Sequence, residues 1–179
     1  NIISAQVEFA KGNISEAKSI CFTLLKSKKD ADIYNLLGVI AFSEKKFLES
    51  LIYLNKCLKI SNNHYKALNN LALVLIDTKK FKKAVHFLNL ALKKNDKFIQ
   101  TYINLSLAYL KLRNYNKSIY YLEKILNIEK KNIFALNNLG SIYYEKRNYR
   151  KSINYYNKAL TISYKNDFVH NNLGLLYER

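Results

Sequence analysis

The sequence predicts an all-α fold, an α-solenoid built from antiparallel helix pairs. Three observations support this prediction: a 34-residue period, a helical spacing of apolar residues within each period, and the absence of proline from a chain of 179 residues with only four glycines. A chain without proline favours helices joined by short turns over a loop-rich all-β fold. The apolar fraction of 49% is enough to build a packed core.

The period is visible in five segments that align without gaps. They read YNLLGVIAF, LNNLALVLI, YINLSLAYL, LNNLGSIYY and HNNLGLLYE, and their small residues are Gly38, Ala72, Ser106, Gly140 and Gly174. An aromatic series has the same period, at Phe47, Phe81, Tyr115 and Tyr149. We therefore divide residues 1–179 into repeats at about 1–30, 31–64, 65–98, 99–132 and 133–166, with an incomplete repeat at 167–179, all within one solenoid domain.

Each repeat is predicted to form two helices. Counting from Ala31, Tyr65, Ile99, Ile133 and Asp167, positions four, seven, eight and eleven carry apolar or small residues, which is the spacing of one helix face. The small residue at position eight allows close approach of a second helix, which begins at the aromatic residue and extends over about Tyr115–Ile128 in the fourth repeat. One such pair cannot bury its apolar face alone, so neighbouring repeats must stack.

This pattern resembles the tetratricopeptide repeat, which has an aromatic residue or Leu at position four, Leu-Gly at seven and eight, Tyr near eleven and Ala near twenty and twenty-seven. Residues 1–30 fit the same pattern in a form one residue shorter. The usual proline at position thirty-two is replaced by Asn62, Asp96, Lys130 and Tyr164. The resemblance implies a right-handed superhelix whose first helices line a concave groove, and a non-catalytic scaffold that binds protein partners.

Positions two, five, six, nine and thirteen face away from the core and form the predicted groove. Asparagines occupy positions five and six of this groove in most repeats. We call the following residues the amide row: Asn70, Asn104, Asn138 and Asn172 at position six, with Asn69, Asn137 and Asn171 at position five. Leu73 and Leu107 form an apolar floor beside it, and Lys66, Asp77 and Lys111 add charges. Each amide offers two donors and an acceptor, which suits the backbone of an extended peptide. Asparagine is abundant here, with 23 in the chain, so bonding of these amides to neighbouring turns is the competing interpretation.

The amide row also resembles the asparagine ladder in the repeat arm of O-linked N-acetylglucosamine transferases. The segment SEAKSICFTLLKSKKDADIYNLLGVIA is similar to the first repeats of bacterial proteins that join such arms to glycosyltransferase or sulfotransferase domains. A chain that begins at Asn1 and contains no Met is expected to be part of a longer protein. The alternative function is therefore substrate recognition for a larger transferase.

The net charge of +17 is a third guide to function. Twelve of the 30 basic residues fall between positions fourteen and nineteen, where the paired helices connect: Lys45, Lys46, Lys79, Lys80, Lys82, Lys83, Arg113, Lys117, Lys146, Arg147, Arg150 and Lys151. This basic stripe suits nucleic acid or an acidic partner. We favour a solvated surface instead, because Lys predominates and no aromatic residue is expected to interleave the stripe for base stacking.

Catalytic and metal-binding patterns are absent from the sequence. His64, His86 and His170 stand in different repeats without a second ligand at metal spacing, and we expect no metal, cofactor or catalytic residue. Cys21 and Cys57 are expected at small core positions, and a reducing, cytoplasmic location is favoured. No apolar run is long enough for a membrane span. The terminal helix over Asp167–Arg179 offers an apolar face for self-association.

Overall fold

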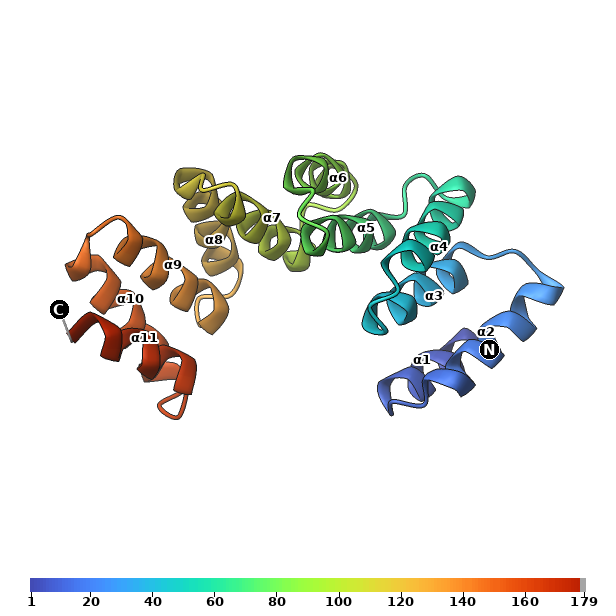
Figure 1. Cartoon of the computed structure of the whole chain (residues 1–179), viewed down its shortest axis with the longest axis horizontal. Coiled ribbons are helices and arrows are strands. Elements are labelled where there is room, and N and C mark those ends of the chain that lie inside the picture. Colours follow the sequence, from blue (N-terminus) through green and yellow to red (C-terminus); the bar gives the residue numbers. More distant parts are fainter. Residues whose placement is uncertain (178–179) are drawn as a thin grey trace. The chain divides into compact units, whose positions relative to one another are not determined.

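The structure, a computed structural model, describes residues 1–177 apart from the side chains of Phe168, Leu175 and Tyr177 (Figure 1). The last two positions of the predicted repeat 167–179 lie outside the described residues. Over the described range, the regular secondary structure is entirely α-helical, which confirms the predicted fold class. The helices are α1 (Ile2–Ala10), α2 (Ile14–Ser27), α3 (Ala31–Ser43), α4 (Phe47–Ile60), α5 (Tyr65–Asp77), α6 (Phe81–Lys94), α7 (Ile99–Lys111), α8 (Tyr115–Ile128), α9 (Ile133–Glu145), α10 (Tyr149–Ile162) and α11 (Asp167–Tyr177).

The helix bounds follow the 34-residue period closely. In the repeats at 31–64, 65–98, 99–132 and 133–166, the first helix covers the first thirteen positions and the second begins at the aromatic residue. The predicted second helix Tyr115–Ile128 matches α8 at both ends. Within repeats, α3 packs on α4, α5 on α6 and α9 on α10, and successive repeats are joined by contacts such as those of α4 with α5 and α10 with α11.

The chain forms two compact units, Asn1–Thr101 and Tyr102–Arg179, with the boundary inside α7. In the first unit, Ala5, Cys21 and Leu37 belong to a buried cluster that joins α1, α2 and α3. In the second unit, Tyr156 and Val169 belong to a buried cluster that joins α9, α10 and α11. Within each unit, apolar side chains at helical spacing therefore pack helices that follow one another in the sequence, such as α1 with α2 and α9 with α10.

Small residues at position eight allow the paired helices to approach closely, as predicted. A Cβ atom added to Gly38 would lie 2.6 Å from Leu54 Cγ, and one added to Gly140 would lie 2.5 Å from Tyr156 Cε1. A serine on the second helix then bonds to the first, since Ser152 Oγ donates to the Gly140 carbonyl at 2.8 Å. Gly174 differs, with no atom within 4 Å of an added Cβ, because the described residues include no second helix of the same repeat after α11.

Each turn between paired helices has three residues, and the middle one has left-handed backbone. Gly12 has φ 87° there, and the later turns place basic residues in the same region, with φ 59° at Lys45, 61° at Lys79, 55° at Arg113 and 56° at Arg147. Lys45 N donates to Phe42 O at 2.8 Å and Lys46 N donates to Ala41 O at 2.9 Å. These bonds satisfy carbonyl groups at the end of α3, as expected of a helix that ends in a left-handed residue.

Candidate functional site

The amide row in the first unit makes a bond between neighbouring repeats. Asn70 Nδ2 on α5 donates to Asn35 Oδ1 on α3 at 2.9 Å. Asn35 occupies position five of one repeat, and Asn70 occupies position six of the next. The bond therefore joins the first helices of two repeats. Each carboxamide has two N–H donors and an oxygen with two lone pairs, so both side chains keep donors and acceptors that this bond does not use.

The second unit repeats this bond between α9 and α11. Asn172 Nδ2 donates to Asn137 Oδ1 at 3.0 Å, again from position six to position five of the preceding repeat. Asn138 behaves differently, because its Nδ2 donates to the Phe134 carbonyl of its own helix at 2.8 Å. Some amides of the row thus bond to neighbouring parts of the solenoid. These bonds compete with ligand binding for the donors and acceptors of the same side chains.

Burial divides the predicted site residues. Asn69 and Asn104 are only 2% exposed, so these two do not face an open groove as the helix geometry predicted. The reason is that positions five and six lie toward the adjacent first helix as well as away from the core. The remaining members of the row are reachable: Asn70, Asn137, Asn138 and Asn172 are half-buried, and Asn171 is exposed. Leu73 and Leu107 are half-buried, and Lys66, Asp77 and Lys111 are exposed.

A small pocket adjoins the amide row in the second unit. It has a volume of about 200 Å³ and is lined by Ser141, Tyr144, Glu145, Tyr156 and Asn172. Ser141 and Glu145 occupy positions nine and thirteen of the predicted groove face, so the pocket opens among groove residues. Tyr156 comes from the second helix α10 and is 2% exposed. The sequence does hold a signal for this pocket, because Tyr156 stands where the three preceding repeats have Leu54, Leu88 and Leu122.

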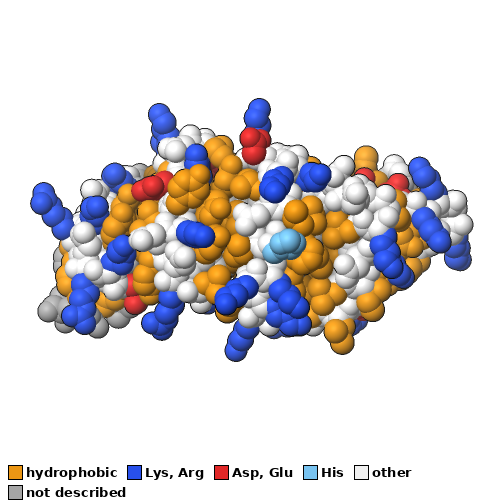
Figure 2. All heavy atoms as spheres, turned by 90° about the horizontal axis from the view of Figure 1, so that it is seen from above, with side chains coloured by type: hydrophobic (Ala, Val, Ile, Leu, Met, Phe, Trp, Pro, Cys, Tyr) orange, Lys and Arg blue, Asp and Glu red, His pale blue; other side chains and the backbone are white. Residues whose placement is uncertain are grey.

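The twelve residues of the basic stripe are all exposed. Figure 2 shows basic side chains across the visible face of the molecule, with far fewer acidic side chains among them. In the second unit, two of these residues line a shallow pocket of about 470 Å³ between the turn that follows α7 and the end of α9. Its lining residues are Leu112, Arg113, Asn114, Tyr115, Asn116 and Lys146.

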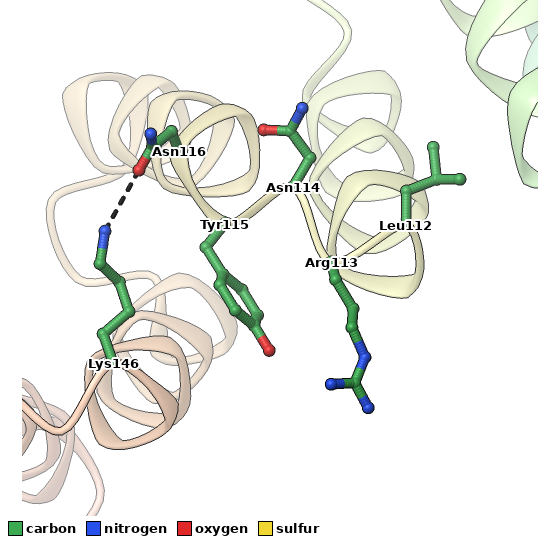
Figure 3. Close-up of a pocket in the computed structure, with 6 residues that line it drawn as sticks. All are labelled: Leu112, Arg113, Asn114, Tyr115, Asn116 and Lys146. Atoms are coloured by element: carbon green, nitrogen blue, oxygen red, sulfur yellow. Dashed lines mark hydrogen bonds between the residues drawn. The ribbon is translucent and has the colours of Figure 1, made fainter.

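An aromatic side chain lies within this basic pocket, contrary to the sequence-based expectation. Figure 3 shows the Tyr115 ring with Arg113 on one side and Lys146 on the other. Lys146 Nζ donates to Asn116 Oδ1 at 3.2 Å, which holds the ammonium group near the start of α8. The sequence did not reveal this placement, because the aromatic series that includes Tyr115 was used only to mark the start of the second helix.

The cysteines are in the core, as predicted. Cys21 and Cys57 are fully buried free thiols. Burial, with a smaller contribution from the carboxylates of Asp32 and Asp30, raises the pKa of the Cys57 thiol to about 12. Burial also raises the pKa of Cys21. Both side chains therefore stay protonated near neutral pH, and a protonated thiol is a poor nucleophile.

The histidines that the structure describes include two with clear structural bonds. His64 Nδ1 accepts from Ala67 N at 3.0 Å and so caps α5, while its Nε2 lies 2.9 Å from Asp32 Oδ1. His170 Nε2 lies 2.6 Å from the Tyr164 carbonyl oxygen. Among the described residues, no three His, Cys, Asp or Glu side chains gather in a way that could hold a metal ion. None of the described helices has the length and apolar character needed to cross a membrane.

Comparison with known families agrees with the helix pairs. Two profiles of the tetratricopeptide repeat match the sequence, one over residues 31–64 and 65–96 and the other over residues 98–165. These segments cover most of the chain, which belongs to the tetratricopeptide repeat family. No curated protein matches the sequence.

Solved structures of similar fold include several tetratricopeptide repeat proteins. The structure of Pseudomonas aeruginosa PilF has a TM-score of 0.89 at 20% identity, and the match covers 99% of this chain and 81% of PilF. MamA from Desulfovibrio magneticus RS-1 has a TM-score of 0.80 at 20% identity, with 91% and 93% covered. YrrB, described as a TPR protein with an unusual peptide-binding site, has a TM-score of 0.78 at 16% identity, with 97% and 90% covered.

Proposed function

We propose that this protein is an interaction scaffold that holds an extended segment of a partner along its first helices. Membership of the tetratricopeptide repeat family supports a role in protein interaction. The observation that carries the finer proposal is the half-buried amide groups of Asn70, Asn137, Asn138 and Asn172 at groove positions. Their bonds to neighbouring turns occupy part of each carboxamide, and the remaining donors and acceptors suit a peptide backbone of any sequence. The peptide-binding site named for YrrB is consistent with this use of the fold.

The proposal is tested by removing two accessible amides of the row. Asn138→Ala and Asn171→Ala are combined, because Asn138 is half-buried and Asn171 is exposed, and neither change opens the core. The probe is a displayed library of random peptides of about 12 residues, long enough in extended form to span several helices. We expect selected peptides to bind the double variant about tenfold more weakly than the unchanged protein.

A matched control uses exposed asparagines on the second helix of the same unit. Asn154→Ala and Asn157→Ala on α10 remove the same number of amides from the opposite layer. The control should retain peptide affinity, and both variants should keep the helicity and melting temperature of the unchanged protein. Equal affinity of the groove variant and the control would rule out the amide row as the binding surface.

The substrate-arm alternative places an extended segment in the same groove. It differs from the scaffold in requiring a glycosyltransferase or sulfotransferase domain in the same polypeptide. The sequence of the full-length gene separates the two functions, since a catalytic domain beside these repeats supports the arm and further repeats alone support the scaffold.

A second candidate function is binding of an acidic partner at the basic turns. The specific observation in its favour is the pocket in which Arg113, Tyr115 and Lys146 meet. We expect the combined change Arg113→Gln and Lys146→Gln to weaken binding of single-stranded oligonucleotides and of polyglutamate. Wild-type binding should also fall steeply as salt rises. No measurable binding of either probe at about 50 mM salt would eliminate this candidate.

A further inference from the structure

The pocket beside the amide row in the second unit differs from the rest of the repeat array. At position nine, Ser141 stands where other repeats have Val39, Leu73 and Leu107. At position twenty-four, Tyr156 replaces a leucine that is fully buried in the three preceding repeats. The two departures meet, because Tyr156 Oη and Ser141 Oγ lie 3.1 Å apart. A polar pair has thus replaced an apolar one at a single place in the groove.

Gly140 makes this arrangement sterically accessible. Its α-hydrogen side faces the Tyr156 ring so closely that an added Cβ would lie 2.5 Å from Cε1 and 2.6 Å from Cδ1. The tyrosine ring therefore passes over Gly140 from the second-helix layer, and its hydroxyl reaches Ser141 at the pocket. Three neighbouring features of one repeat, a glycine, a serine and a buried tyrosine, together create the cavity and its polar end.

The hydrogen bonds inside the pocket determine what it presents to a ligand. Ser141 Oγ donates to the backbone carbonyl of Asn137 at 3.1 Å, so the one proton of the serine hydroxyl is already in a hydrogen bond. The Tyr156 hydroxyl must then donate to Ser141 Oγ. Burial raises the pKa of Tyr156, which keeps this phenol protonated and able to donate. The oxygen of Tyr156 is left with lone pairs and no further proton.

Two further residues contribute acceptors. One N–H of Asn172 Nδ2 donates to Asn137 Oδ1 at 3.0 Å, which leaves Asn172 with its side-chain carbonyl oxygen and one remaining N–H group. Glu145 contributes an exposed carboxylate at the rim. The adjacent cation Lys146 donates to Asn116 on α8 at 3.2 Å, so its ammonium group is held by another helix. The pocket accordingly combines a carboxylate with neutral acceptors, a set that suits a cationic donor.

From this geometry we infer that the pocket lined by Ser141, Glu145, Tyr156 and Asn172 binds one Lys or Arg side chain of the segment held in the groove. The inference rests on the proposed peptide-binding function and adds a sequence preference to it. The volume of about 200 Å³ is below that of sites for whole small molecules and fits a single side chain. The backbone of the bound segment would be held by the amide row, and this pocket would select one side chain along it.

The first test measures side-chain preference with a peptide library in which one central position is fixed as Lys, Arg, Gln, Glu or norleucine. The unchanged protein should bind the Lys and Arg sets about tenfold more tightly than the norleucine set. Ser141→Leu restores the residue of Leu73 and Leu107 and fills the pocket, and Glu145→Gln removes its charge while keeping its shape. Both variants should lose the preference and retain binding of the norleucine set. Glu123→Gln, an equal charge change on the exposed part of α8, should keep it.

The second test uses a probe that does not depend on the groove. N-acetyl-arginine methylamide is titrated into isotope-labelled protein, with N-acetyl-norleucine methylamide as control, and the side-chain amide signals of Asn172 are followed by NMR. The arginine compound should shift these signals in the unchanged protein and leave them unmoved in Ser141→Leu. Shifts without any library binding would support the pocket and overturn the groove proposal. Library binding with no Lys or Arg preference and no shift would overturn the pocket and leave the groove proposal in place.

Discussion

Thr101 is a polar residue at a core position. Its side chain is fully buried, and its Oγ1 has no hydrogen-bond partner among the described residues. The equivalent position three is apolar in the other repeats, at Ile33, Ala67, Ala135 and Val169. We expect Thr101→Val to raise the free energy of unfolding by about 1 kcal/mol, because it removes an unsatisfied hydroxyl while keeping the shape of the side chain. Urea denaturation measures the change.

A threonine that already has a partner provides the control for this prediction. Thr161 Oγ1 donates to the Lys158 carbonyl at 2.7 Å on an exposed part of α10. Thr161→Val should change the free energy of unfolding by no more than about 0.5 kcal/mol. A loss of stability in Thr101→Val would show that the hydroxyl is satisfied in solution, for example by a buried water.

Single residues also mark the limit of prediction from sequence. Positions four, seven, eight and eleven were predicted to be buried, and Leu37, Leu71, Leu105 and Leu139 at position seven are nearly inaccessible. The burial of Asn69 and Asn104 was not predicted, because a helix wheel separates core from groove but does not place the neighbouring first helix. The contact of the Tyr156 hydroxyl with Ser141 at the pocket was also not predicted, because an aromatic residue at a core position first suggests packing alone.

At the scale of the element, the period in the sequence was enough to place the helices. The first position and the aromatic position seventeen of each repeat coincide with helix starts in α3 to α10. Their caps are local as well, as in Asn114, Asn132 and Asn148, whose side-chain oxygens accept from backbone N–H groups three residues ahead. What the period could not provide was the backbone conformation of the turns, because lysine and arginine are not signals for left-handed backbone.

The turn between α5 and α6 offers a test of that conformation. Lys79 has φ 61°, a region that disfavours any residue with a Cβ atom by about 1 kcal/mol. Lys79→Gly relieves this strain, although the added freedom of the unfolded chain offsets part of the gain. We expect the free energy of unfolding to stay equal or to rise by up to about 1 kcal/mol. Thermal and urea unfolding provide the measurement.

The comparison for Lys79→Gly is a lysine with helical backbone four residues further along the sequence. Lys83 lies in the first turn of α6 and is exposed. Lys83→Gly should lower the free energy of unfolding by about 0.5–1 kcal/mol, because glycine is a poor helix former. If Lys79→Gly destabilises the protein as much as Lys83→Gly does, the left-handed conformation at Lys79 is not a source of strain.

For the whole molecule, charge and fold have separate consequences. The net charge of +17 suggested nucleic acid, whereas the repeat pattern assigned much of that charge to turns outside the predicted groove. All twelve residues of the basic stripe are exposed. The helix-pair fold, by contrast, follows from apolar periodicity and small residues such as Gly38 and Gly140, which the charge does not affect. A binding preference for acidic partners therefore has to come from local geometry, as at Arg113 and Lys146, and not from the total net charge of the chain.

The same charge predicts how stability responds to salt. Many exposed cations of one sign repel one another in the folded state, and salt screens this repulsion over about 10 Å at 0.1 M. Attractive ion pairs oppose this effect, such as Lys11 with Glu8 at 2.9 Å, in which the Lys11 side chain is largely exposed. We expect the melting temperature to rise by several degrees between about 20 mM and 300 mM NaCl. Lys82 and Lys83 lie together at the start of α6. A variant with Lys82→Gln and Lys83→Gln should have a higher melting temperature at low salt and a smaller rise of the melting temperature with salt. A melting temperature that falls with salt in both proteins would mean that attractive charge pairs outweigh the net repulsion.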